Sequence, residues 1–339
     1  MSRTRSLVSE LSRFAVQKMA GAFVGRLKSL NLFRRGAVLL ALMCTAASGQ
    51  SLRCDTPQNF TLPDNDGAIQ RPVWKRDSQI VFTSGLRVNT DGAANSYHPI
   101  GTSKGALNTI CNAIAIKPLS GPYAGVRISS KFPNDGPNKL DGKVRCQMIL
   151  DAFRRSMTAD YAILPDVEID WYALASRSPH AGKYRPCIQQ TGEFKGFFVA
   201  QTARAADPLL DVCDPAHWIS STSIPYITLP GARLAEHGAS PGDLALVHRR
   251  NNGAEVWVVA IAADTGNKNE LGEGSIALHI ALGQTWQGRI PGNIGDGVTT
   301  FLFPGRKAKS PVSRVSLEAQ RGALMSALGK NAGWVNCKR

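Results

Sequence analysis

Acidic residues are scarce in this sequence, and repeated segments are absent from it. Asp and Glu number 25 against 40 Lys and Arg, so the formal net charge is +15. No internal repeat and no low-complexity tract occurs, and 43% hydrophobic with 19% charged residues is a globular composition that argues against wholesale disorder. After residue 50 no Lys/Arg run is interleaved with aromatic residues, so we expect no nucleic-acid partner despite the positive charge.

Metal-binding and nucleophile motifs are missing as well. None of the seven cysteines is spaced as C-x-x-C and the six histidines show no ligand-like spacing, so we expect neither a metal nor another cofactor. Residues 238–242 do spell the G-x-S-x-G pattern of serine hydrolases. That pattern needs a strand before it and a helix after it. Pro241 and Gly242 lead into a strand instead, so a serine nucleophile is not expected.

The N-terminus carries the three parts of an export signal. Arg34-Arg35 precede a short apolar run at 37–44, and the small residues Ala46-Ala47-Ser48 follow. The run is far shorter than the roughly 20 residues that span a bilayer. We therefore predict that residues 1–48 are a signal peptide and that the protein is secreted or periplasmic, without stable membrane insertion afterwards. A membrane-anchored N-terminal segment is the alternative.

Cysteine usage agrees with export. Removing the signal peptide leaves six cysteines, an even number that suggests up to three disulfides in an oxidising compartment. Free buried thiols are the alternative. Cys54 and Cys337 lie near the two ends of the remaining chain, and we predict that they pair and tie those ends together.

Most of the remaining chain has the pattern of short β-strands. Runs rich in Val, Ile and aromatic residues are bounded by Gly, Pro, Asn and Asp. These runs are 80–83, 197–202, 224–229, 244–248, 255–263, 275–282 and 298–303. Such a strand–turn rhythm favours a barrel or sandwich over βαβ units.

Two segments have helical spacing, 144–157 and 316–328. The first lies in a Pro-, Gly- and charge-rich stretch, 121–186, which we interpret as an insertion in the β core. We therefore divide the chain into a signal peptide (1–48), an N-terminal segment (49–85), a β domain (86–305) and a C-terminal helical extension (306–339). The predicted fold is a small closed β-barrel with a partly helical insertion and a C-terminal helix.

The most informative window is 256–282. A strongly apolar strand ends in Asp264-Thr265-Gly266, a polar loop follows, and Gly272-Glu273-Gly274 opens the next run. Two carboxylates at facing ends of consecutive strands can meet at one rim of a barrel. Gly272 and Gly274 are expected to leave the backbone beside Glu273 open for a bulky substrate.

Paired carboxylates suit glycoside hydrolysis. One donates a proton to the departing oxygen and the other, ionised, activates water or attacks the sugar. Proximity separates the two pKa values because two like charges do not ionise cheaply together. Spacing alone leaves a bland alternative open, since Asp-Thr-Gly is also a common turn.

The sequence resembles glycoside hydrolase family 75, the fungal-type chitosanases. Residues 264–266 and 272–278 are similar to the family signature D-x-G…G-E-[AG]-S-I-[AS]-L. Four further segments match family motifs in the same order: 91–99 (DGAANSYHP), 224–230 (IPYITLP), 241–245 (PGDLA) and 299–305 (TTFLFPG). The resemblance covers roughly residues 86–305 without the insertion.

The resemblance implies endo-hydrolysis of the β-1,4 bonds of chitosan with inversion, with Asp264 and Glu273 as the essential carboxylates. Glu273 is assigned as general acid and Asp264 as general base, although the sequence leaves this order open. Asp91, Tyr97, His98 and Asp243 are candidate substrate-binding residues, with each carboxylate on an amino group and the tyrosine stacked on a sugar ring. Turn or core packing is the alternative for each.

Three further aromatic residues, Trp171, Tyr172 and Trp286, are candidates for stacking surfaces or for buried packing. An Asp-Thr-Gly after a long strand is also similar to double-psi barrels, so six strands in a double-psi-like arrangement are expected. The predicted partner is a polysaccharide, and the predicted state is monomeric.

Chitosan is a polycation, however, and +8 of the net charge remains outside residues 1–50, which hold eight basic residues and one acidic residue. The charge of the cleft itself should therefore matter more than the total. Two other functions stay open: a peptidoglycan-active lytic enzyme working with one acid, and a non-catalytic glycan-binding module.

Overall fold

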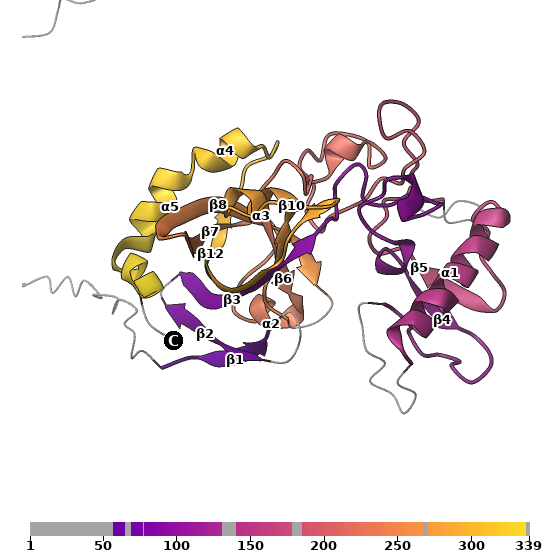
Figure 1. The fold of residues 1–339 in the computed structure, drawn as a ribbon, viewed down its shortest axis with the longest axis horizontal. Coiled ribbons are helices and arrows are strands. Elements are labelled where there is room, and N and C mark those ends of the chain that lie inside the picture. The colour runs from indigo at the N-terminus through magenta and orange to yellow at the C-terminus, as the bar shows by residue number, and fades with distance from the viewer. Residues whose placement is uncertain are drawn as a thin grey trace, which may run out of the picture. The chain divides into compact units, whose positions relative to one another are not determined.

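A computed structural model describes residues 57–64, 69–76, 78–130, 140–177, 185–266 and 270–336. All of them belong to one compact unit, residues 49–339 (Figure 1). The predicted signal peptide at 1–48 and the predicted Cys54–Cys337 pair lie outside the described residues. No helix among the described residues is both long and apolar enough to cross a membrane.

Six strands close into a barrel, as predicted. In order around the barrel they are β3 (Gln79–Asn89), β12 (Ile294–Lys307), β7 (Asp243–Asn251), β8 (Ala254–Gly266), β6 (Tyr226–Pro230) and β9 (Glu273–Ser275), and β9 pairs back with β3. The β6–β8 and β3–β9 pairs are parallel, and the other four are antiparallel. β1 (Phe60–Pro63) and β2 (Gln70–Arg76) extend the sheet from β3.

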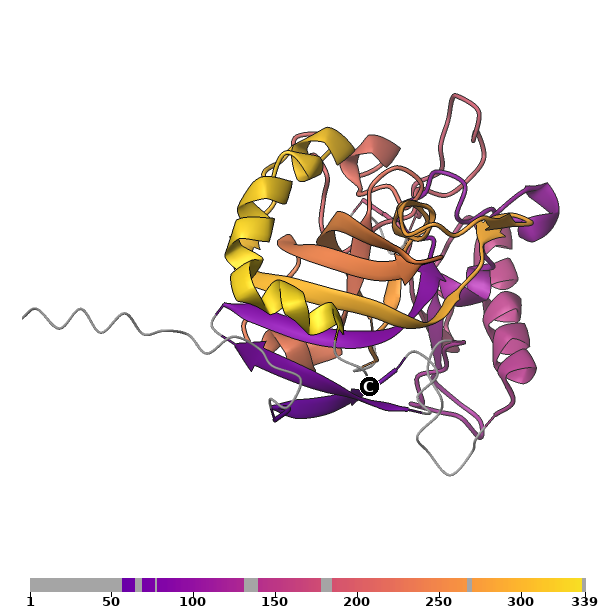
Figure 2. The same ribbon diagram turned by 60° about the vertical axis from the view of Figure 1, so that its left-hand side comes forward.

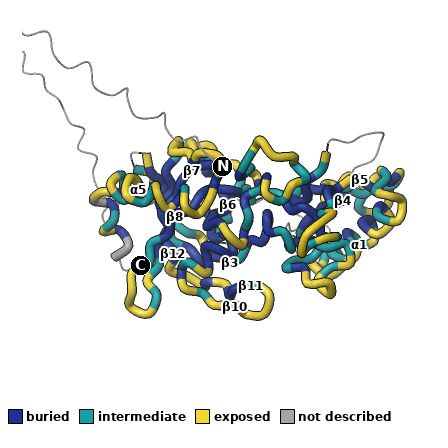
Figure 3. The backbone as a smooth tube through the Cα atoms, turned by 90° about the horizontal axis from the view of Figure 1, so that it is seen from above, coloured by how far each residue is buried: buried dark blue, intermediate teal, exposed yellow. Residues whose placement is uncertain are grey.

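Alternation along the strands builds two hydrophobic clusters, one on each face of the barrel wall. In β8, Val258, Ala260 and Ala262 pack in the cluster that fills the barrel. The intervening Val259, Ile261 and Ala263 pack in a second cluster with Leu317 and Leu324. The latter two belong to the C-terminal helices α4 (Arg314–Glu318) and α5 (Arg321–Leu328), so this second cluster is the outer face. Figure 2 shows these helices, in yellow, lying along the strands, and Figure 3 shows buried backbone concentrated in the strands.

The predicted helix at 316–328 is interrupted. The chain turns at Ala319-Gln320, and Arg321 donates to the carbonyl oxygen of Trp257 at 3.0 Å, which fixes the start of α5 against β8. The first helix, α4, begins at Ser313 with a capping box formed with Ser316. The periodicity was continuous in sequence because both short helices bury leucines against the same strands.

Residues 97–200 form a second body of structure, which we call the lobe. It holds η1 (Thr102–Lys104), η2 (Ile110–Asn112), β4 (Ala115–Pro118), α1 (Gly142–Thr158) and β5 (Val167–Asp170). Its own core contains Ile149 and Phe153 from α1, packed with Trp171 and Phe198. The helix predicted at 144–157 is confirmed as α1. This core draws on residues on both sides of the predicted 121–186 insertion.

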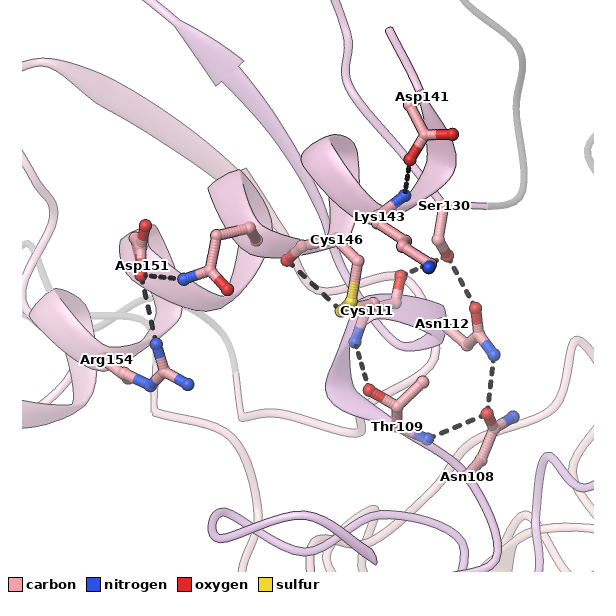
Figure 4. The surroundings of a disulfide bond; sticks show 11 residues. Asn108, Thr109, Cys111, Asn112, Ser130, Asp141, Lys143, Cys146, Asp151 and Arg154 are labelled. Carbon is pink, nitrogen blue, oxygen red and sulfur yellow. Dashed lines mark hydrogen bonds and ion pairs between the residues drawn. A yellow bond between two sulfur atoms is a disulfide. The ribbon is translucent and has the colours of Figure 1, made fainter.

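Two disulfides hold the lobe and its continuation. Cys111–Cys146 ties η2 to α1, and Cys187–Cys213 ties the end of the lobe to the segment before β6. Figure 4 shows the first bridge with the hydrogen bonds around it. The expectation of disulfides is confirmed for these four cysteines. Closing loops of 35 and 26 residues stabilises a fold by about 3–4 kcal/mol per bridge in the chain-entropy account.

Two predicted strands are wrong. The run at 275–282 is a strand only to Ser275 and then becomes α3 (Ile276–Ala281), because the Ser275 hydroxyl accepts the Leu278 amide proton and caps a helix. Four residues of α3 are buried, so its sequence shows no amphipathic period. The run at 197–202 forms only isolated bridges, Leu174 with Ala200 and Ile188 with Phe198. The remaining short elements are α2 (Gly231–Ala235), β10 (Trp286–Gln287), β11 (Ile290–Pro291), η3 (Pro215–His217) and η4 (Gly329–Asn336).

Candidate functional site

A cleft of about 480 Å³ lies between the barrel and the lobe. This volume falls within the range of small-ligand sites. The charged residues that line the cleft come from the barrel side: Arg87, Asp91, Asp264, Glu270 and Glu273. The lobe contributes uncharged polar residues: Asn108, Asn112, Ser130 and Tyr172. Of the described lining residues, four are therefore acidic and one is basic, which makes this part of the surface negative in a positively charged protein.

Asp264 and Glu273 reach the cleft from strands on the two sides of β6. Thr228 pairs with Asp264 on one side, and Ile227 pairs with Gly274 on the other. Two strand spacings place these backbones about 10 Å apart. Both carboxylate residues are half-buried, and neither is sealed in the interior. The structure thus brings the two predicted catalytic residues to one groove.

A bulge precedes Asp264. In the β6–β8 pair, Ile227 opposes Ala262 and Thr228 opposes Asp264, so Ala263 is an extra residue in β8. An inserted residue breaks the alternation of side chains and re-aims the next one. Ala263 still packs in the outer cluster, whereas Asp264 lines the cleft.

Asn89, which the sequence analysis missed, contacts Asp264 directly. Its side-chain Nδ2 donates to Asp264 Oδ2 at 2.8 Å and to Thr228 Oγ1 at 3.0 Å. The backbone N–H of Ala203 donates to the other carboxylate oxygen, Oδ1, at 3.3 Å. Asn89 is 3% exposed at the end of an otherwise apolar strand. A buried amide in that position is the signal that marks it, but sequence alone does not give its partner.

Asp91 lines the cleft and is held from the lobe side. The hydroxyl of Tyr97 donates to Asp91 Oδ1 at 2.5 Å, and the Asp91 backbone N–H donates to Asn89 Oδ1 at 2.7 Å. The Tyr226 hydroxyl lies 3.0 Å from Asn89 Oδ1 and 2.9 Å from the Asp91 carbonyl oxygen. Burial, with the nearby charges of Asp264 and Asp91, raises the pKa of Tyr226 well above its usual value. The phenol therefore stays protonated and serves as a donor.

Three predicted substrate-binding residues do not line the cleft. Tyr97 is completely buried in the lobe core, so the stacking prediction is wrong and its hydroxyl supports Asp91 instead. His98 lies outside the cleft, with its ring edge against Phe197 at a centroid distance of 4.7 Å.

Asp243 is the third, and its side chain is fully buried. It accepts the backbone N–H groups of Ser240 at 2.7 Å and Gly305 at 3.0 Å, and it pairs with Lys307 at 2.8 Å. The prediction of a substrate contact is therefore wrong for Asp243. Burial with satisfied partners makes this carboxylate a brace between the turn before β7 and the end of β12.

The glycines beside Glu273 have a different role from the one expected. Gly272 has φ +88°, and a Cβ there would lie 2.3 Å from the carbonyl oxygen of Gly85. At Gly274 a Cβ would lie 2.9 Å from the carbonyl oxygen of Tyr226. The missing side chains let β9 fit between β3 and β6, and the prediction that they make room for substrate is wrong.

The aromatic candidates divide into three cases. Tyr172 lines the cleft, and its hydroxyl donates to the carbonyl oxygen of Asn112 at 2.8 Å. Trp171 is buried in the lobe core. Trp286 is 53% exposed in β10 and lies outside the cleft. Among the described residues, no group of three or more His, Cys, Asp or Glu side chains is placed to hold a metal ion.

No protein-family model matches the chain, and no curated protein matches it. The chemistry that the cleft supports is therefore inferred from its own residues. Two half-exposed carboxylates face a groove, and one of them accepts N–H donors from a fixed amide and a backbone group. Such a site can hold one carboxylate ionised and transfer a proton through the other.

Proposed function

We propose that the protein is an exported glycoside hydrolase that cuts the β-1,4 bonds of chitosan or a related amino-sugar glycan with inversion. The observation that carries this proposal is the placement of Asp264 and Glu273 on opposite sides of β6, both lining one cleft. The family resemblance of the five motifs adds support, because these two residues are the positions that match the family's essential carboxylates.

In this mechanism Glu273 is the general acid and Asp264 the general base. Glu273 donates its proton to the glycosidic oxygen as the bond to the anomeric carbon breaks. Asp264 takes a proton from a water molecule whose oxygen bonds to that carbon from the opposite face. Inverting enzymes keep their carboxyl groups about 6.5–9.5 Å apart to admit this water. A backbone separation of about 10 Å across β6 is compatible with that arrangement rather than with a nucleophile in direct contact.

The charge of the cleft supports a cationic substrate. Four acidic residues and one arginine line its described part, whereas the whole protein carries a formal +15. Screening limits electrostatic effects to about 8 Å at physiological ionic strength, so a bound ammonium group responds mainly to the charges of the cleft. Two disulfides support export, because such bonds persist in oxidising compartments.

The test is product analysis of the purified protein on chitosan, chitin and peptidoglycan. We expect chitosan oligomers whose new reducing ends first have the inverted anomeric configuration, as read by NMR. Glu273→Gln should lower hydrolysis by at least about 100-fold, the usual contribution of a general acid, and should still bind chitosan. Glu236→Gln, an exposed residue that pairs with Arg233 outside the cleft, is the matched control and should keep full activity.

Each other result contradicts a definite part of the proposal. Anhydro-sugar ends from peptidoglycan indicate the lytic enzyme, and binding without products indicates a glycan-binding module. Hydrolysis that survives in Glu273→Gln removes Glu273 as the acid.

A further inference from the structure

The orientation of the Asn89 amide is fixed by its neighbours. A backbone N–H is always a donor, so the group 2.7 Å from the Asp91 nitrogen must be the side-chain oxygen of Asn89. The Tyr226 hydroxyl lies 3.0 Å from the same oxygen. The amide nitrogen is therefore turned toward Asp264 Oδ2 and Thr228 Oγ1.

This amide is also rigid. Asn89, Thr228 and Tyr226 are all buried, and Tyr226 is completely so. The register pairs Asn89 of β3 with Ser275 of β9 and Thr228 of β6 with Asp264 of β8. A donor held by three strands keeps its direction while the substrate binds and leaves, which is the condition for a preorganised electrostatic contact.

We propose that Asn89 is the positioning residue of the cleft: its amide N–H holds Asp264 in place and in the ionised state that removes a proton from water. The inference rests on the proposed hydrolase function and adds a residue to it. A donor to a carboxylate stabilises the anion, and the Ala203 N–H on the other oxygen acts in the same direction. Together they distinguish Asp264 as the base of the pair.

Other charged and titratable groups also bear on Asp264 and must be weighed with Asn89. These groups are Asp91, Glu270 and Glu273, Arg87, and the phenols Tyr97, Tyr172 and Tyr226. The nearby acids favour a protonated Asp264, so a fixed donor is what opposes them. Removing that donor should therefore let the acids raise the pKa of Asp264.

Asn89→Asp tests the contact with almost no change in shape. The new side chain still accepts the Asp91 N–H but presents an oxygen to Asp264 in place of the N–H. We expect the Asp264 carboxyl, followed by carbon NMR in protein labelled at aspartate and assigned with Asp264→Asn, to titrate about one unit or more higher. The acidic limb of kcat/KM on chitosan should move upward by the same amount, a tenfold loss per unit below that limb, because this limb reports the base in the free enzyme.

Two further variants make the result decisive. Tyr226→Phe removes one donor from the Asn89 oxygen and should shift the same limb in the same direction by less; it carries the test if Asn89→Asp does not fold. Asn59→Asp adds the same charge at an exposed site where the side-chain oxygen accepts the Lys75 N–H, and should move neither readout. An unchanged titration of Asp264 in Asn89→Asp and Tyr226→Phe overturns the inference. A wild type that hydrolyses no glycan overturns the proposed function, and the NMR titration alone then decides whether Asn89 sets the ionisation of Asp264.

Discussion

Single polar side chains decide the geometry of the cleft from positions that a substrate does not touch. Tyr97 and Tyr226 are completely buried, yet their hydroxyl groups fix Asp91 and Asn89. Their rings meanwhile belong to the hydrophobic cores of the lobe and the barrel's outer face. A tyrosine beside an acidic segment is therefore evidence for a polar network here, and stacking on a sugar falls to Tyr172, the aromatic residue that lines the cleft.

Asp243→Ala should reduce stability and leave catalysis intact. Its carboxylate accepts two backbone N–H groups and pairs with Lys307, all without exposure to the cleft. Losing hydrogen bonds to a buried charge costs about 2–3 kcal/mol in the free energy of unfolding, which urea unfolding will measure. The kcat/KM on chitosan at low temperature should match wild type. Asp151→Ala on the exposed face of α1 is the control; a stable Asp243→Ala variant with lost activity would instead make Asp243 a cleft residue.

Among the elements, β9 and α3 position the catalytic acid. β9 is three residues long and bridges β3 and β6, with Gly272 and Gly274 allowing the close fit. The chain then turns into α3 through the Ser275 cap, and His279 of α3 lies with its ring nitrogens 2.9 Å from the Ser275 carbonyl oxygen and 3.1 Å from that of Leu86. This histidine links the helix after Glu273 to the strand that carries Asn89.

The pH dependence of stability should reveal that link. Burial lowers the pKa of His279, and the two carbonyl contacts oppose only part of this effect. A lowered pKa in the folded state means that the unfolded chain binds the proton more readily. Stability is then fully present above the ordinary histidine pKa of about 6.5 and is lost as the pH falls from there toward the lowered pKa.

We expect the free energy of unfolding to decrease by up to about 1.4 kcal/mol per pH unit in that window, with a smaller slope in His279→Gln. Unfolding in denaturant at a series of pH values measures both slopes. His248, whose pKa burial also lowers, titrates in both proteins and cancels in the difference. Equal slopes for wild type and variant would show that His279 does not carry the effect.

On the scale of the whole molecule, the barrel and the lobe supply different chemistry to one groove. The barrel brings the charged residues, and the lobe brings amide, hydroxyl and phenol groups that are bonded to one another around the Cys111–Cys146 bridge (Figure 4). The lobe core forms from segments far apart in sequence, and its two disulfides limit how far it can loosen. The groove thus depends on tertiary contacts from both bodies.

The local charge of the cleft predicts a salt effect opposite to that of the total charge. We expect KM for chitosan to rise several-fold between 50 mM and 500 mM salt, because shorter screening lengths weaken the attraction between ammonium groups and the cleft acids. The value of kcat should change little. Steady-state kinetics on chitosan oligomers will measure both, with binding of uncharged chitin oligomers as the control. A KM that falls with salt would mean that the overall positive charge dominates.

Some of the protein was determined by local sequence alone. The alternating apolar runs bounded by Gly, Pro, Asn and Asp specify strands because side chains in a strand alternate between faces, and the spacing of 144–157 specified α1. The pairing of Asp264 with Glu273 was also accessible, because a short loop joins the strands that carry them. No comparable local signal separated α3 from a strand, since its residues are buried on most sides.

The tertiary structure decided which polar residues meet. Asn89 and Asp264 are 175 residues apart, and Asn89 and Tyr226 are 137 apart. Such contacts arise when β3, β6 and β8 take their places in the closed barrel, and no periodicity in the chain encodes them. Burial likewise turned Tyr97 and Asp243 from candidate ligands into internal supports, because a side chain's chemistry depends on the face it occupies, and that face is chosen by packing.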